Sequence, residues 1–183
     1  KELGKCTESI SRDEMELFVI PSFTTLYSAK SIAKNANITL GAQNMAWEDR
    51  AALTGEISPL MLKEVGVKIV ELGHSERRHI MGETDEMQRK KINKALSHNF
   101  WPLLCIGETL EQKENGIADE VLKTQLKIAL GDVMAEQADN LWVAYEPVWA
   151  IGESGQPATP DYAAEKHKVI RDTLIELFGQ NIN

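Results

Sequence analysis

Short apolar segments alternate with longer amphipathic ones along this chain, and this alternation limits the possible folds more than any other feature. The apolar segments predict five strands, over residues 16–20, 38–42, 68–72, 101–106 and 141–145. Apolar residues at helical spacing predict five helices, over 24–34, 58–66, 84–99, 118–135 and 159–178. Strands that alternate with helices pair in parallel. The pattern therefore predicts an α/β fold, with a parallel sheet that is either open or closed into a barrel.

The predicted strands are apolar throughout rather than on alternate positions, which is typical of sheets covered on both faces. The 183 residues are enough for one domain, and no Pro- or Ser-rich linker divides them. We expect residues 1–183 to form a single domain, with a long irregular segment over 45–57 between a strand and a helix.

A polar pair follows four of the predicted strands at the point where each strand ends. The pairs are Gln43-Asn44, Gly73-His74, Gly107-Glu108 and Glu146-Pro147. In parallel α/β folds the carboxyl ends of the strands lie on one side of the sheet, where ligand and catalytic sites are built. The spacing therefore predicts a site at this end of the sheet.

Glu146 is a carboxylate among apolar neighbours. Partial removal from water would raise its pKa and make it a better general base. The alternative is a structural carboxylate that pairs with Lys or Arg. The segment that follows carries Gly152 and Gly155, whose N–H groups could bind a phosphate. The alternative is that this segment is an ordinary surface loop.

His74 stands at the equivalent position after an earlier strand. If Ser75 begins a short helix, the positive helix end disfavours the imidazolium form, and a neutral His74 can donate a hydrogen bond to a carbonyl. The alternative is a histidine bonded within the core. The nearby charged residues are interpreted as a solvated ion-pair patch that consists of Arg77, Arg78, Glu83 and Asp85. This interpretation applies above all to Arg78, whereas Arg77 could instead brace loops.

Composition excludes several functions. The net charge of −8 argues against nonspecific nucleic-acid binding, although a local positive field could still hold a small anion. No apolar run is long enough to span a bilayer, and no signal peptide is visible. Cys6 and Cys105 predict no disulfide, so a reducing cytoplasm is expected. Nucleotide-binding motifs and metal-ligand spacing are both missing, so we expect no metal.

Five motifs carry a resemblance to a known family. They are GAQN at 41–44, TGEISP at 54–59, LGHSERR at 72–78, LCIGET at 104–109 and AYEPVWAIG at 144–152. In these motifs and their order the chain resembles the triosephosphate isomerase family. The resemblance covers nearly the whole chain and is far more specific than any single motif.

The resemblance implies a TIM (β/α)₈ barrel, represented here by strands two to six with their helices. It implies an intramolecular aldose–ketose isomerase that interconverts glyceraldehyde 3-phosphate and dihydroxyacetone phosphate through an enediolate, without a cofactor. The roles come from the family: Glu146 is the general base, neutral His74 is the electrophile, and Glu76 supports the site. Gly152 would bind the substrate phosphate.

The resemblance also implies a lid and a dimer loop. The lid residues are Pro147, Val148, Trp149, Ala150, Ile151, Gly152, Glu153, Ser154, Gly155, Gln156, Pro157, Ala158 and Thr159. The dimer loop, over 45–56, would reach into a neighbouring subunit; its marker residues are Asn44, Thr54, Gly55 and Glu56. The implied partners are a small phosphorylated sugar and a second copy of the chain.

The chain departs from the family in two respects. It contains no Asn-x-Lys motif at a first strand and no seventh or eighth strand, so we expect it to be part of a longer protein, and expect little isomerase activity if it is not. The lid is about one residue longer than usual. With NMAW at 44–47, VELG at 70–73 and DYA at 161–163, this favours a tetrulose (erythrulose) phosphate isomerase as an alternative. A non-catalytic binding module is the alternative of another class.

Overall fold

The structure, a computed structural model, describes residues 2–152 and 155–180. Within these ranges five parallel strands form one sheet in chain order. They are β1 (Phe18–Val19), β2 (Thr39–Ala42), β3 (Ile69–Leu72), β4 (Trp101–Ile106) and β5 (Trp142–Tyr145). All five predicted strands are confirmed, although β1 is shorter than its apolar segment. The α/β prediction is therefore correct.

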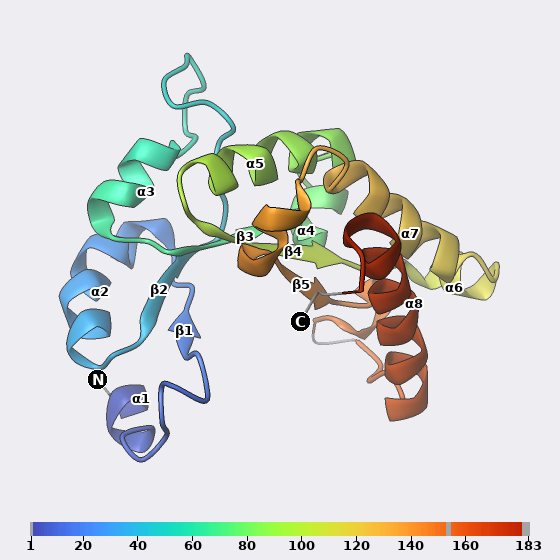
Figure 1. The fold of residues 1–183 in the computed structure, drawn as a ribbon, viewed down its shortest axis with the longest axis horizontal. Coiled ribbons are helices and arrows are strands. Elements are labelled where there is room, and N and C mark those ends of the chain that lie inside the picture. The colour runs from blue at the N-terminus through green and yellow to red at the C-terminus, as the bar shows by residue number, and fades with distance from the viewer. Residues whose placement is uncertain (1, 153–154, 181–183) are drawn as a thin grey trace.

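A long helix follows each strand and covers the outer face of the sheet (Figure 1). These helices are α2 (Phe23–Asn35), α3 (Pro59–Val65), α5 (Asp85–Ser97), α7 (Ala118–Ala129) and α8 (Pro160–Phe178). The shorter ones are α1 (Glu2–Cys6), α4 (Ser75–His79), α6 (Leu110–Glu114), and the 3₁₀ turns η1 (Ala135–Asn140) and η2 (Val148–Ala150). Ser58, Thr84 and Thr159 cap their helices through the side-chain oxygen, as their positions predict.

The predicted helix over 118–135 is wrong at its C-terminal end. Helix α7 stops at Ala129, and η1 begins separately at Ala135. The break falls at Gly131 and Asp132, and the Asp132 carboxylate pairs with Arg89 of α5. Glycine weakens a helix by its conformational freedom, which explains a stop here. Helix α6 was not predicted, although Thr109 and Gln112 form a capping box at its start.

The sheet curls strongly. Phe18 of β1 and Trp142 of β5 touch edge to face, with ring centroids 5.6 Å apart. In a flat sheet the first and fifth strands would be about 19 Å apart, at about 4.8 Å per step. The contact therefore requires a curved sheet, and the arc in Figure 1 has its helices on the convex side. This curled half-barrel is consistent with part of a (β/α)₈ barrel.

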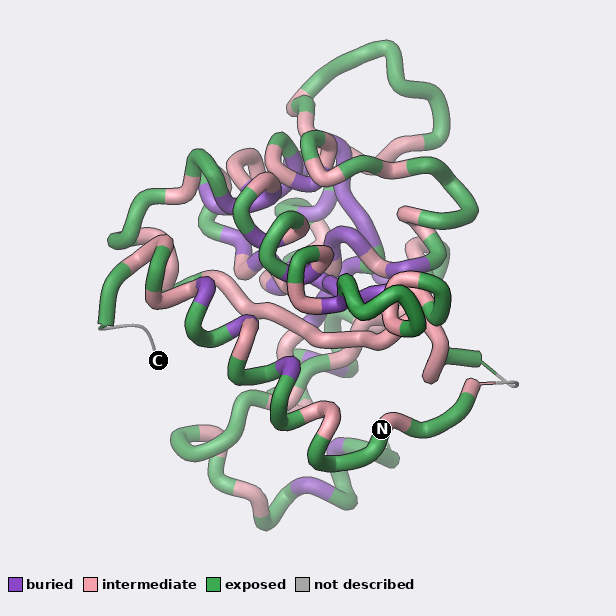
Figure 2. The backbone as a smooth tube through the Cα atoms, turned by 90° about the vertical axis from the view of Figure 1, so that its right-hand side faces the viewer, coloured by how far each residue is buried: buried purple, intermediate pink, exposed green. Residues whose placement is uncertain are grey.

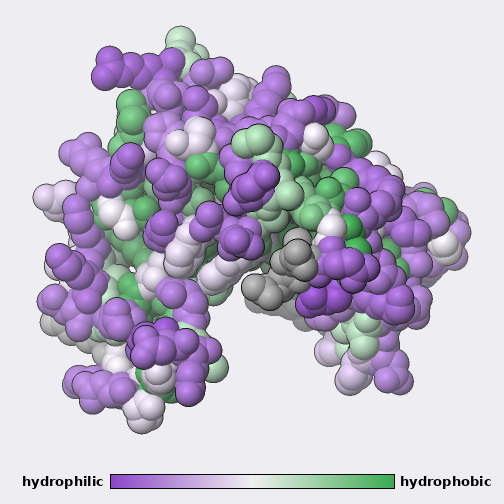
Figure 3. All heavy atoms as spheres, in the orientation of Figure 1, coloured by the Kyte–Doolittle hydropathy of each residue, from purple (hydrophilic) through white to green (hydrophobic). Residues whose placement is uncertain are grey.

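The core lies between the sheet and the helices. Val70 and Leu72 of β3 pack in one cluster with Ile92 and Leu96 of α5, while the next strand and α7 contribute further members. Figure 2 shows this buried layer in the middle of the molecule, and Figure 3 shows mostly hydrophilic side chains along the outer rim. Alternate residues such as Ile69 and Glu71 consequently face the inside of the curl.

The segment between β2 and α3 contains no helix or strand over residues 45–57 and projects from the body of the molecule (Figure 1). This agrees with the irregular segment that the sequence predicts. Among the described residues, no helix is long and apolar enough to cross a membrane.

Candidate active site

His74 lies in the turn between β3 and α4. The chain leaves β3 through Gly73, whose φ of +76° is the left-handed conformation that favours glycine. His74 is the N-cap of α4, and its Nδ1 accepts the backbone N–H of Glu76 at 3.3 Å. The short helix expected at Ser75 is therefore present. A ring nitrogen that accepts this bond carries no proton, so the imidazole proton of neutral His74 lies on Nε2.

Glu146 is the first residue after β5, and the structure brings it to His74. Its carboxylate Oε2 lies 3.3 Å from His74 Nε2, and its Oε1 accepts the backbone N–H of Ser75 at 2.8 Å. Gly107, directly after the intervening strand β4, leaves room for this approach, because a Cβ there would overlap the Glu146 carbonyl. The two residues from separate strand ends thus form one pair.

The surroundings of Glu146 favour a base. Burial raises the pKa of its carboxyl, while His74 and the Ser75 N–H lower it by a smaller amount, so that the net pKa is raised. The side chains remain accessible, with 17% of Glu146 and 26% of His74 exposed. A ligand can therefore reach both groups from solvent.

Glu76 contributes to the site mainly through its backbone. Its N–H fixes His74 Nδ1, but its carboxylate is 72% exposed and lies 3.7 Å from the same ring nitrogen. Its supporting role stays a prediction.

The candidate lid begins as the turn η2 and ends at Thr159, which caps α8. Gly152 is exposed, has a φ of +83° and has open space where a Cβ would lie. The Gln156 N–H donates to the Trp149 carbonyl at 3.2 Å, which ties the two sides of the loop together. Glu153 and Ser154 lie outside the described residues.

Glu108 is a central residue of the site region to which the sequence assigned no role. Its side chain is completely buried and accepts hydrogen bonds from the Trp149 indole at 2.8 Å and from the hydroxyls of Tyr145 and Tyr162 at 3.1 and 2.9 Å. Lys113 lies 3.5 Å from the Trp149 ring centroid. The polar pair Gly107-Glu108 after β4 indicated Glu108 in the sequence. The residues that bond to Glu108, however, lie far from it in the sequence. Glu108 thus anchors the start of the lid.

The interpretation of Arg78 as a solvated ion-pair residue is wrong. Its side chain is only 8% exposed, pairs with Asp85, and donates to the carbonyls of Gly73 and Cys105 at 2.6 and 3.2 Å. A guanidinium has five donors, so it can satisfy several buried acceptors around the His74 turn.

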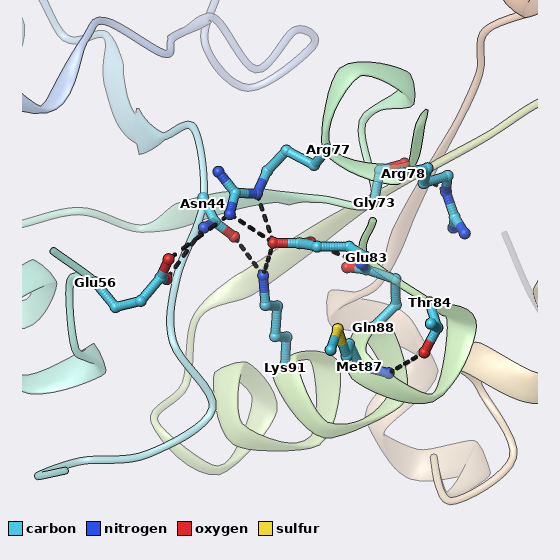
Figure 4. Close-up of polar contacts among 10 residues, drawn as sticks. All are labelled: Asn44, Glu56, Gly73, Arg77, Arg78, Glu83, Thr84, Met87, Gln88 and Lys91. Atoms are coloured by element: carbon cyan, nitrogen blue, oxygen red, sulfur yellow. Dashed lines mark hydrogen bonds and ion pairs between the residues drawn. The ribbon is translucent and has the colours of Figure 1, made fainter. Parts of the chain in front are cut away.

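Arg77 braces loops, as the sequence suggested. It joins Glu83 at 2.6 Å and approaches Glu56 of the dimer loop at 3.7 Å (Figure 4). The buried Lys91 donates to Glu83 at 2.6 Å and to Asn44 at 2.8 Å, and Asn44 donates to Glu56 at 3.4 Å. The base of the dimer loop is thereby connected to α4. Thr54 and Gly55 of the dimer loop are exposed.

Comparison with known proteins shows to which family the chain is similar. The family model described as triosephosphate isomerase matches residues 1–183. The triosephosphate isomerase of Caldanaerobacter subterraneus subsp. tengcongensis is 51% identical over 91% of this chain and 66% of its own length. That of Carboxydothermus hydrogenoformans is 50% identical over 92% and 66%.

A relative with a different name is almost as similar. The L-erythrulose-1-phosphate isomerase of Rhizobium etli is 48% identical over 94% of this chain and 66% of its own length. The chain thus spans slightly less than two thirds of these relatives. From the family model, these identities, the curled parallel sheet and the paired strand ends, we conclude that the chain belongs to the triosephosphate isomerase family.

Proposed function

We propose that the protein is an intramolecular aldose–ketose isomerase that interconverts glyceraldehyde 3-phosphate and dihydroxyacetone phosphate. The observation that carries this proposal is the pairing of Glu146 Oε2 with His74 Nε2 at 3.3 Å. A carboxylate base beside a neutral hydrogen-bond donor is what proton transfer next to a carbonyl requires.

Glu146 removes a proton from the carbon next to the substrate carbonyl and returns it to the neighbouring carbon. Its raised pKa, caused first by burial, strengthens it as a base. In the structure one carboxylate oxygen is bound to the Ser75 N–H. The other oxygen faces His74, so a substrate that displaces this contact meets both groups.

His74 polarises the carbonyl. The N–H of Glu76 occupies its Nδ1, which leaves the Nε2 proton to donate to the carbonyl oxygen. The charge that develops on this oxygen in the enediolate strengthens that hydrogen bond. The same nitrogen then transfers protons between the two substrate oxygens.

The lid over 147–159 supplies the phosphate contact in this proposal. The N–H of exposed Gly152 is the candidate donor, and the Glu108 contacts to Trp149 fix one end of the loop while the other end is held by the Thr159 cap. Closure of such a loop would exclude water from the enediolate.

A four-carbon substrate is the second candidate. The Rhizobium etli relative named L-erythrulose-1-phosphate isomerase, at 48% identity, favours it. The motifs NMAW at 44–47, VELG at 70–73 and DYA at 161–163, which resemble that branch of the family, favour it as well. The chemistry would be the same, and only the fit of the sugar would differ.

The proposal includes a homodimer joined through the dimer loop and a cytoplasmic role in glycolysis and gluconeogenesis. Thr54 and Gly55 support the dimer, because both are exposed in a segment that projects from the body of the molecule (Figure 1), and the space around Gly55 is open. Membership of the family supports the metabolic role.

The test is a coupled assay of the purified protein with glyceraldehyde 3-phosphate and, separately, with erythrulose 1-phosphate. Glu146→Asp shortens the side chain by one methylene group and so displaces the carboxylate from the substrate. A displacement of about 1 Å is expected to lower the rate about 100-fold. His74→Gln removes the acid–base group and should cost about 100-fold or more. Wild-type protein without activity on either substrate would favour the non-catalytic module, and unchanged rates in both variants would remove this pair from the mechanism.

A further inference from the structure

Glu71 is an acidic residue on the inner face of the sheet, below the catalytic pair. Its neighbours in β3, Val70 and Leu72, pack against the helices, so the alternation of a strand turns Glu71 toward the inside of the curl. In the parallel register Glu71 lies beside Leu103 of β4. Most inner positions of a barrel are apolar because they fill a packed core, and a carboxylate here is an exception.

The Glu71 side chain reaches toward the site. Its Oε1 lies 4.0 Å from the Cys105 thiol, and Cys105 is paired with Ala144, two residues before Glu146. Burial raises the pKa of the Cys105 thiol, and the charges of Glu146 and Glu71 raise it further. Cys105 therefore lies within electrostatic reach of both carboxylates, and Glu71 is at the floor under Glu146.

The described residues offer Glu71 no strong partner. Among the residues that the structure describes, it makes no ion pair with Lys, Arg or His within 4.0 Å, and the weakly donating thiol is its one side-chain hydrogen-bond contact. Burial raises the pKa of its carboxyl, and the nearby His74 offsets this only in part. A half-buried carboxylate without a good donor costs free energy that a hydroxyl group of a ligand would recover.

The geometry of the candidate substrates identifies that hydroxyl. In dihydroxyacetone phosphate the carbon that loses its proton carries one hydroxyl and ends the molecule. In erythrulose 1-phosphate the same carbon carries an additional hydroxymethyl group, at the end away from the phosphate. If the phosphate binds at Gly152 of the lid, this additional group would lie at the far end of the substrate, where Glu71 is the candidate partner.

We propose that Glu71 is a specificity-determining residue that accepts a hydrogen bond from the terminal hydroxymethyl group of a four-carbon ketose phosphate. This rests on the proposed isomerase function and names the substrate class of the same site. The reaction moves one proton from C3 to C2 through Glu146 and one proton between the two oxygens through His74. The carbonyl moves from C2 to C3, and no oxidant, reductant or other reactant is consumed.

The experiment measures kcat/KM of the intact protein for erythrulose 1-phosphate and for dihydroxyacetone phosphate. The ratio of the two values should fall about 10- to 100-fold in Glu71→Leu, because a hydrogen bond to a charged group contributes about 1.5–3 kcal/mol. Glu71→Gln keeps the shape and one acceptor oxygen and should give a smaller fall. Glu120→Leu, at an exposed position of α7, is the matched control and should leave the ratio unchanged.

The outcomes separate the two proposals. A wild-type protein that isomerises triose phosphate but not the four-carbon ketose overturns the role of Glu71 and leaves the proposed function standing. The same is true of a ratio that is equal in wild type, Glu71→Leu and Glu71→Gln. A protein inactive on both substrates overturns the function and this inference together. If Glu71→Leu does not fold, the ratio in Glu71→Gln decides.

Discussion

The Nε2 atom of His74 lies 3.3 Å from one carboxylate oxygen of Glu146, and the N–H of the next residue, Ser75, holds the other oxygen at 2.8 Å. Two consecutive residues of one turn thus orient a carboxylate that follows another strand. The relationship joins the ends of β3 and β5 across β4. The effect of this hydrogen bond on the pKa of Glu146 can therefore be tested by removing the Ser75 N–H.

Ser75→Pro should move the acid limb of kcat/KM to higher pH. The substitution removes the N–H that stabilises the Glu146 carboxylate, so the pKa of Glu146 rises further and less base is ionised at a given acidic pH. Proline suits the first position of α4, and the His74 ψ of 143° suits a residue before proline.

Ser75→Ala is the matched control, because alanine keeps the N–H. Its acid limb should coincide with that of the wild type. Coincidence of all three profiles would show that the Ser75 N–H does not act on the base.

Lys91→Met should destabilise the fold by about 3 kcal/mol, measured by urea unfolding. Lys91 is 1% exposed, and its loss leaves the buried Glu83 carboxylate with Arg77 and Gln88 alone. Lys94→Met on the same helix is the control, since its contact with Asp49 at 3.5 Å is at the surface and should contribute about 0–1 kcal/mol. Equal losses in both variants would contradict the importance of the buried network.

The stability difference between wild type and Lys91→Met should shrink on acidification. Burial raises the pKa of Glu83, but hydrogen bonds from Lys91 and Gln88 outweigh this and hold the net pKa below its ordinary value. A depressed carboxyl pKa contributes stability above the unfolded-state pKa, and this is lost as pH falls through the folded-state pKa. Urea titrations from neutral pH to about pH 4 test this, and a constant difference would refute it.

Glu108→Gln should lower the pKa of Tyr162. This pKa is measured by ultraviolet absorbance during an alkaline titration. Burial, and then the hydrogen bond and charge of Glu108, raise the pKa of Tyr162 to about 12. The neutral amide removes the charge that opposes phenolate formation, so the pKa moves back toward about 10. Tyr162→Phe identifies which part of the absorbance change belongs to Tyr162. If the Tyr162 titration has the same midpoint in Glu108→Gln as in the wild type, burial alone raises this pKa.

Thr54→Arg should convert the proposed homodimer to monomer in light scattering. Thr54 is exposed in the dimer loop, where a long charged side chain would not fit a close interface. Thr124→Arg makes the same change at an exposed position of α7 and should leave the dimer intact. Dissociation by both variants, or by neither, would place the interface elsewhere.

The elements of this fold can be predicted from sequence because each strand is a continuous apolar run with a helical pattern after it. The end of α7 was misplaced because Val133 and Ala135 continue an apolar pattern beyond Gly131, although the helix has already stopped. Local spacing also placed His74 and Glu146 at strand ends. Their approach to 3.3 Å depends on the order and parallel register of the strands, which spacing alone does not specify.

Residues whose roles depend on distant partners were the least predictable. Arg78 resembles a surface charge in its local sequence, yet it is buried because the carbonyl of Cys105 on the next strand needs a donor. Glu108 was visible as a polar residue after β4, but its meaning comes from Trp149 and Tyr162, which only the fold brings near.

In the proposed mechanism, Glu146 moves a carbon-bound proton through an enediolate. The most direct measurement is isomerisation of dihydroxyacetone phosphate in D₂O, with deuterium at the reacting carbons followed by proton NMR. We expect deuterium incorporation by the wild-type protein and loss of both exchange and isomerisation in Glu146→Gln, which keeps the shape but has no basic carboxylate. Isomerisation without deuterium incorporation, or exchange that persists in Glu146→Gln, would contradict it.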